Sequence, residues 1–150
     1  MGHTYTSNLV HVVFSTKDRQ RLISSELQPR LWPYLAGIAQ QNDFKALAVG
    51  GMEDHVHILL SLPAKLAMAK SVQFIKGGSS KWIHDTFPEH KNFAWQKGYG
   101  AFSIGISQLP ATVAYIRAQP EHHRKVSFQE EFIRFLKKHG IEYDEQYVWG

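Results

Sequence analysis

Two histidines stand two residues apart in the run DHVHILLSLP, which otherwise has the composition of a buried strand. Side chains at positions i and i+2 of a strand point to the same face, so His55 and His57 are expected side by side, with Val56 and Ile58 in the core. Two neighbouring imidazoles can hold one divalent cation. Because the chain contains 9 histidines, chance also produces such pairs. The alternative is that these histidines are hydrogen bonded within the protein or exposed on its surface.

A second group of reactive side chains lies in the segment AYIRAQPEHHRK. Tyr115 and Gln119 are four residues apart, so a helix would place a phenol and a carboxamide on one face. Tyrosine is a nucleophile once its proton is withdrawn, and a glutamine carbonyl oxygen is a ligand for hard cations. Two histidines are too few for a closed zinc site, so this segment is the candidate source of further ligands. A core tyrosine beside an exposed glutamine is the alternative.

Four more polar residues lie near these groups in the sequence. Asp54 adjoins the histidine pair and could orient an imidazole, but strand alternation points it away from them. His11 is expected to be a packed histidine, although it would approach His57 if their strands adjoin. His122 and His123 are expected in a solvated basic turn, with extra ligands or phosphate contacts as the alternative.

Composition limits the class of protein. The chain is 43% hydrophobic and 20% charged and contains no cysteine. Its length predicts a single domain spanning residues 1–150. Disulfides, thiolate nucleophiles and cysteine-ligated zinc are excluded, which agrees with a reducing compartment. No apolar run reaches the length of a signal peptide or a membrane span, so we expect a cytoplasmic protein with no membrane partner.

The pattern of apolar residues predicts the elements that position these groups. Strands are expected within residues 8–16, 44–51, 54–63 and 99–107, with GGME joining the middle two as a hairpin. Helices are expected over 24–43, 64–84, 109–120 and 128–139, the last capped by Ser127. The glycine pair in GGSS, residues 77–80, predicts a break in the second helix or a close approach to a ligand. This order predicts an α+β fold: a ferredoxin-like antiparallel sheet with helices on one face, followed by C-terminal helices that carry Tyr115.

A His–hydrophobic–His triplet on a strand, followed about sixty residues later by YIRAQPEHH, resembles the single-tyrosine HUH transposases of the insertion-sequence 200/605 family. The resemblance extends over WQKGYGAFSIGIS and SFQEEFIRFLKKHGIEYDEQYVW. It implies a metal-binding pair at His55 and His57, a nucleophile at Tyr115 and a third ligand at Gln119. Ala118 stands where many members carry asparagine. The family uses Mg²⁺ or Mn²⁺, although imidazole ligands alone would favour manganese, nickel or zinc.

The same resemblance implies a homodimeric prokaryotic enzyme that acts at the nucleoid. Its substrate would be single-stranded DNA with hairpins at the ends of an insertion sequence. A 5′-phosphotyrosine intermediate would conserve the energy of the broken bond, so that another 3′-hydroxyl can rejoin the strand. The tyrosine helix of one subunit can serve the histidines of the other, and the sequence leaves both pairings open.

Positive charge marks the expected DNA-binding surface. The net charge is +4, and residues 65–97 contain six lysines and two acids, which equals this whole excess. Such a segment attracts phosphates, and a solvated helix face is the alternative. Phe74, Trp82, Phe93 and Trp95 add aromatic rings that could stack on bases. The expected DNA contacts are Lys65, Lys70, Lys76, Lys81, Arg124 and Lys125.

Two other functions fit parts of the sequence. KGYGAFSIGI resembles the aromatic strand of RNA-recognition modules, which share this order of elements, but the match breaks after KGYG and falls on the wrong strand. Such a noncatalytic module would bind single-stranded RNA or DNA without metal. A metal-dependent phosphohydrolase or nuclease would use the histidine pair to activate water and leave no covalent adduct.

Overall fold

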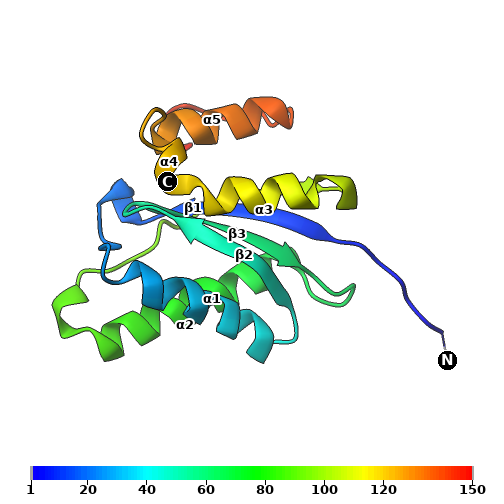
Figure 1. Ribbon diagram of the computed structural model, residues 1–150, viewed down its shortest axis with the longest axis horizontal. Coiled ribbons are helices and arrows are strands. Elements are labelled where there is room, and N and C mark those ends of the chain that lie inside the picture. Colours follow the sequence, from blue (N-terminus) through cyan, green and yellow to red (C-terminus); the bar gives the residue numbers. More distant parts are fainter. Residues whose placement is uncertain (1, 150) are drawn as a thin grey trace.

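The computed structural model describes residues 2–149, and its centre is one antiparallel sheet (Figure 1). The sheet contains β1 (Leu9–Ser15), β2 (Lys45–Gly51), β3 (His55–Ser61) and β4 (Gly100–Ile104). Their order is β2-β3-β1-β4, and each neighbouring pair is antiparallel. The predicted α+β class and ferredoxin-like order are therefore confirmed.

One face of the sheet packs on α1 (Gln28–Gln41) and α2 (Met68–Thr86), which lie together below it in Figure 1. Alternate residues of the two central strands supply this core, as expected for a strand period of two. From β1 and β3 they are Val10, Val12, Phe14, Val56, Ile58 and Leu60. The predicted inward direction of Val56 and Ile58 is confirmed.

The glycine pair does not break α2, so the predicted interruption is wrong. A Cβ atom on Gly78 would lie 3.0 Å from Cδ1 of Ile38, which shows how closely α1 approaches α2 here. Glycine costs a helix about 1 kcal/mol relative to alanine. Burial of Val72, Ile75 and Ile83 along the same helix offsets that cost.

The other face of the sheet is covered by α3 (Leu109–Arg117), α4 (Gln119–His122) and α5 (Phe128–Lys138) (Figure 1). The helix predicted through residue 120 ends early, because Ala118 has φ −93° and ψ 15°. Pro120 then falls in the first turn of α4, where its missing N–H is not needed. This bend separates Tyr115 on α3 from Gln119 on α4.

The cap and apolar stripe of α5 explain how it docks on the sheet. The backbone N–H of Glu130 donates to Ser127 Oγ at 3.2 Å, which confirms the predicted N-cap. Phe128, Phe132 and Leu136 pack against Val13 and Phe102, and the tail adds Tyr143, Val148 and Trp149 to the same cluster. This packing brings the neighbours of Phe132 on α5 toward β3.

The remaining regular elements are short. The 3-10 turns are η1 (Lys17–Arg19), η2 (Pro88–His90) and η3 (Ile106–Gln108). Because β4 ends at Ile104 and η3 begins at Ile106, Ile106 is 68% exposed instead of continuing the predicted strand alternation. Among residues 2–149, no helix combines the length and the apolar character needed to cross a membrane.

Candidate metal and tyrosine site

The histidine pair lies on the sheet face that α3, α4 and α5 cover. His55 and His57 project from β3 on the same side, and both are fully buried. A buried imidazole requires a hydrogen-bond partner or a metal, because desolvation of its nitrogens is otherwise uncompensated. The predicted side-by-side arrangement is confirmed by a distance of 5.2 Å between the ring centroids.

A buried carboxylate lies between the histidines. Glu131 Oε1 is 2.8 Å from His57 Nε2, 3.2 Å from His123 Nε2 and 3.6 Å from His55 Nε2. These four side chains each offer one ligand atom, and the four atoms lie within 4.8 Å of one another. They form the central cluster of the site: His55, His57, His123 and Glu131.

Outer hydrogen bonds orient the imidazoles of the central cluster. His55 Nδ1 lies 2.7 Å from Asp54 Oδ1, and His57 Nδ1 lies 2.7 Å from His11 Nε2. His123 Nδ1 lies 2.6 Å from the carbonyl oxygen of Val126. With each Nδ1 occupied, all three Nε2 atoms face the centre, as in metal sites whose histidines are held by outer partners.

These contacts correct two expectations. Asp54 contacts His55, because it belongs to the turn before β3, where strand alternation does not apply. His123 does not lie in a solvated turn, since its side chain is only 7% exposed, and His122 also reaches Glu131 at 3.1 Å. His11 is packed as expected and also hydrogen bonded to His57, because β1 and β3 are adjacent.

Gln119 completes the buried polar group from α4. Its Oε1 lies 3.0 Å from His55 Nε2, and its Nε2 donates to Glu131 Oε2 at 3.2 Å. Its side chain is fully buried. Thus the glutamine expected from the resemblance lies beside the histidine pair, with its carbonyl oxygen turned toward His55.

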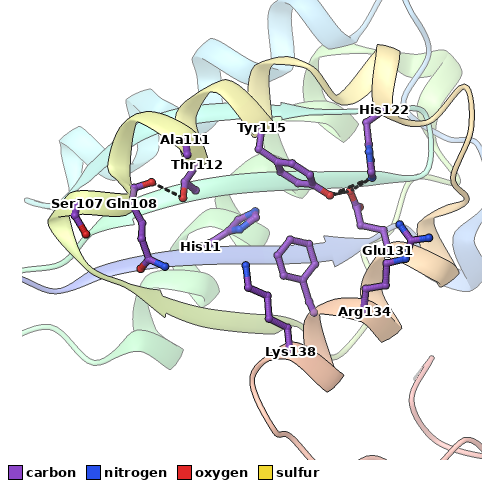
Figure 2. A pocket seen from close by; sticks show the side chains of 11 residues that line it. His11, Ser107, Gln108, Ala111, Thr112, Tyr115, His122, Glu131, Arg134 and Lys138 are labelled. Carbon is purple, nitrogen blue, oxygen red and sulfur yellow. Dashed lines mark hydrogen bonds and ion pairs between the residues drawn. The ribbon is translucent and has the colours of Figure 1, made fainter.

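Tyr115 reaches the same cluster from α3 of the same chain (Figure 2). Its hydroxyl donates to Glu131 Oε2 and lies 3.1 Å from His122 Nε2. Its ring centroid is 5.8 Å from that of His57. Burial, together with the nearby Glu131 carboxylate, raises the pKa of Tyr115 above its usual value, so the phenol holds its proton in this arrangement.

The electrostatics of the cluster centre on Glu131. Burial alone would raise its pKa, but hydrogen bonds from His123 and His57 hold the pKa of this carboxyl well below its usual range. Burial lowers the pKa of His57 to about 4, and burial with the neighbouring His57 lowers the pKa of His11 to about 3. Glu131 is therefore a buried anion, and its partner His57 and the adjoining His11 are neutral.

The chemistry of the donor set fits a cation. A neutral imidazole carries one N–H, yet both nitrogens of His55 face acceptor oxygens, from Asp54 and Gln119. His123 also faces oxygen atoms on both sides. A centre in which imidazole nitrogens, a carboxylate and an amide oxygen converge satisfies the requirements of a divalent metal.

Sequence reasoning missed Glu131, the residue that connects the site. A signal was present, because Glu131 lies three residues after Phe128 and immediately before Phe132, within the apolar stripe of α5. A carboxylate on the buried face of an amphipathic helix needs a partner. The sequence does not reveal that the partners are histidines on β3 and the turn after α4.

Four of the six predicted DNA contacts lie away from this site. Lys70, Lys76 and Lys81 belong to α2, on the opposite side of the sheet. Lys76 Nζ donates to the carbonyl oxygens of residues 96, 97 and 98 at 2.8, 3.3 and 2.7 Å, which uses all three of its N–H groups. Lys81 pairs with Asp85 at 2.9 Å on an exposed surface.

Of the other three predicted contacts, only Arg124 and Lys125 lie near the central cluster. Lys65 follows β3 in the turn before α2. Arg124 and Lys125 line a cavity of about 560 Å³ beside Asp54 and His123. A role of any of these side chains in binding DNA stays a prediction.

The aromatic residues expected to stack on bases are mostly packed in the core. Phe93 is 2% exposed, Trp82 stacks on Tyr34 with centroids 4.1 Å apart, and Trp95 meets Phe14 edge-on. RNA-recognition modules stack bases on an open sheet face. Here α3 to α5 cover that face, which disfavours this alternative.

The sheet order and this cluster define a class: an α+β protein with histidines, a carboxylate and a tyrosine assembled on one covered face of a ferredoxin-like sheet. Comparison with known families is more specific. Residues 4–119 match the family described as "Transposase IS200 like". The match covers well over half of the chain, and the protein belongs to this family.

Individual relatives with similar sequences are also transposases. The ISDra2 transposase TnpA of Deinococcus radiodurans is 31% identical over 95 residues, which are 63% of this chain and 68% of the relative. The transposase for insertion sequence element IS200 of Salmonella typhimurium is 24% identical over 110 residues, or 70% of this chain and 72% of the relative.

Solved structures show the same fold. A Deinococcus radiodurans crystal structure described as a transposase has a TM-score of 0.62 and 25% identity, covering 79% of this chain and 96% of the other. A REP-associated tyrosine transposase bound to a REP hairpin has a TM-score of 0.59, covering 84% and 74%. At 18% identity, the second likeness concerns the fold alone.

Proposed function

We propose that this IS200-like transposase is a metal-dependent enzyme that cuts and rejoins single-stranded DNA through a 5′-phosphotyrosine at Tyr115. One observation carries the proposal. The Tyr115 hydroxyl donates to Glu131, and the same carboxylate contacts the Nε2 atoms of His57 and His123. A nucleophile and a cation-binding cluster are thereby joined through one side chain.

The central cluster would hold the metal through three imidazole nitrogens and the Glu131 carboxylate, with the Gln119 oxygen adjacent. When bound, a divalent ion would neutralise charge on the scissile phosphate and favour the phenolate form of the tyrosine. The family resemblance gives Mg²⁺ or Mn²⁺. Three imidazoles and one carboxylate favour Mn²⁺ of the two, because Mg²⁺ prefers oxygen ligands.

Tyr115 would act as the nucleophile in a balanced displacement. The phenolic oxygen bonds to phosphorus, its proton passes to solvent, and the bond from phosphorus to the 3′ oxygen breaks. The 3′ oxygen takes a proton from solvent and leaves as a hydroxyl. Attack by another 3′-hydroxyl on the phosphotyrosine reverses these changes and joins a new strand without an external energy source.

The proposed substrate is single-stranded DNA with hairpins at the ends of an insertion sequence. One protein of similar fold is a tyrosine transposase whose structure was solved bound to a REP hairpin. In this protein Lys65, Lys70 and Lys81 offer charge for a hairpin stem on the α2 side, and Arg124 and Lys125 offer charge near His123. We also propose a homodimer, as the family resemblance implies.

The decisive experiment mixes the protein with labelled single-stranded DNA carrying candidate element ends, with Mn²⁺, Mg²⁺ or EDTA. Wild type should form a denaturant-resistant adduct with metal only. Tyr115→Phe should form none, while Tyr147→Phe, at a tyrosine that is 70% exposed in the tail, should match wild type. An undiminished adduct in Tyr115→Phe would identify another nucleophile. Metal-dependent cleavage without any adduct would support a nuclease instead.

A further inference from the structure

A cavity of about 520 Å³ opens beside the tyrosine, between α3 and α5 (Figure 2). This volume lies in the range of roughly 300–1,000 Å³ that is typical of ligand sites. The Tyr115 hydroxyl, His122 and Glu131 lie at one end, and Ser107 and Gln108 lie at the other. Ala111 and Phe135 are among the remaining lining residues.

Two cations line this cavity from α5. Arg134 and Lys138 are four residues apart, so they lie on the same face of the helix. Figure 2 shows the Lys138 side chain extending from α5 toward His11. Within residues 2–149 neither cation makes a hydrogen bond or an ion pair with the protein. Both charges are free to meet an anionic ligand.

Helix stability does not account for these cations. Like charges at positions i and i+4 destabilise a helix. A cation in the last turn compensates the helix dipole, but Lys137 supplies that effect as well as Lys138 does, and Arg134 lies before that turn. Lys137 does not line the cavity. The position of Arg134 and Lys138 is better explained by what enters the cavity.

We propose that this cavity binds the single-stranded nucleotide next to the scissile phosphate, with Arg134 and Lys138 contacting the DNA backbone. The inference rests on the proposed function, because the cavity begins at the Tyr115 hydroxyl. Two cations suit a phosphodiester, and the ring of Phe135 with Ala111 offers an apolar surface for a sugar or base. An unpaired strand fits a space bounded by two helices, whereas a duplex does not.

The proposed subsite adds something that the family match does not contain. That match ends at residue 119, and α5 begins at Phe128. Both cations and the Glu131 carboxylate thus come from a segment beyond the matched region. The α5 helix would serve the site in two ways, by contributing a carboxylate to the cluster and by guiding the strand.

The test measures equilibrium binding of a fluorescent, unstructured oligothymidylate by anisotropy in EDTA, where no strand is cut. The Arg134→Ala/Lys138→Ala variant should bind roughly tenfold or more weakly, because two charge-assisted contacts are lost. The slope of log affinity against log salt should fall by about 0.7 for each phosphate contact removed. The matched control is Arg117→Ala/Lys137→Ala, which removes the same charge from exposed positions outside the cavity. Its DNA affinity and its salt slope should stay near the wild-type values.

A second pair of variants tests the space itself. Ala111→Trp fills the cavity from α3, and Ala114→Trp places the same ring at an exposed position of α3 outside it. Only the first should weaken DNA binding. If each variant and its control lose the same DNA affinity, the loss comes from general surface charge or from damage to the helix. The subsite would then be rejected.

The adduct assay separates this inference from the proposed function. If wild type forms the adduct and the cavity variants bind and react like wild type, the function stands and the subsite is wrong. If no protein forms an adduct, yet the cavity variants bind DNA more weakly than their controls, the cavity is a site for single-stranded DNA and the tyrosine chemistry is wrong.

Discussion

The two faces of the sheet are built from the same strands but serve different ends. On the face toward α1 and α2, β3 contributes Val56, Ile58 and Leu60 to a hydrocarbon core. On the face toward α3 to α5, the alternate positions hold His55 and His57, joined to a buried carboxylate. The strand period of two thus lets one segment stabilise the fold and position reactive groups.

The faces also differ in how their side chains are satisfied. The face toward α1 and α2, here called the hydrocarbon face, depends on close packing of Val56, Ile58 and Leu60 with the helices. Such packing is non-directional and tolerates exchange among apolar residues. The face toward α3 to α5, here called the histidine face, depends on hydrogen bonds that have fixed directions. These join Asp54 to His55 and His11 to His57. Changes on the first face should therefore alter stability, and changes on the second should alter metal binding and chemistry.

The largest energetic effect is expected on the hydrocarbon face. Leu60 is 1% exposed and packs between the sheet and its helices. Leu60→Ala should lower the free energy of unfolding by about 2–5 kcal/mol, through lost burial and a residual cavity. Chemical denaturation measures this change. The affinity of the folded protein for Mn²⁺ should stay at the wild-type value, and a large loss would show that the two faces are coupled.

The hydrocarbon face and the sheet order were predictable, because they follow from local periodicity. Strand alternation gave the direction of Val56 and Ile58, and the Ser127 cap gave the start of α5. The predicted break in α2 failed, because Gly78 serves close packing on Ile38, a contact between segments forty residues apart in sequence. The low helix propensity of glycine is a local effect, and tertiary packing outweighs it here.

The histidine face was predictable only in part. The chemistry of His55, His57, Tyr115 and Gln119 was visible in residue types and spacing, and the structure places them together. Glu131 was not found, because its role depends on which face of the sheet α5 covers. That choice is made by contacts of the aromatic stripe with β1 and β4, which no local pattern encodes.

The next largest effect should come from the carboxylate that joins the histidines. Glu131→Gln keeps the shape of the side chain but removes the central negative charge and one ligand oxygen. Mn²⁺ affinity, measured by calorimetry or by competition with a chelator, should fall by more than about 100-fold, beyond the range for outer partners. Glu130→Gln is the matched control, because the neighbouring Glu130 side chain faces Ser127 on the exposed side. Equal affinities in the two variants would exclude Glu131 as a ligand.

A smaller effect is expected from the residue that orients His55. Asp54→Asn preserves a hydrogen-bond partner for Nδ1 but replaces the carboxylate that lies 2.7 Å away. Mn²⁺ affinity should fall by about 10–100-fold, as for other outer partners of metal-binding histidines. Glu53→Gln, one residue earlier in the same turn, changes the charge equally and should have little effect. If Asp54→Asn binds Mn²⁺ like wild type, the Asp54–His55 contact serves folding alone.

The smallest effect, no gain of adduct, is expected when two inactive variants are mixed. This experiment tests whether a single chain provides the whole histidine face. Tyr115 and His57 lie together in a single chain, with ring centroids 5.8 Å apart. A mixture of Tyr115→Phe and His57→Ala proteins should therefore form no more adduct than the two variants form separately, even after exchange of subunits in a homodimer. Light scattering gives the oligomeric state, and gel analysis of the mixture gives the adduct. Restored adduct would require the tyrosine of one subunit to act beside the histidines of another, because only that pairing unites an intact Tyr115 with an intact His57.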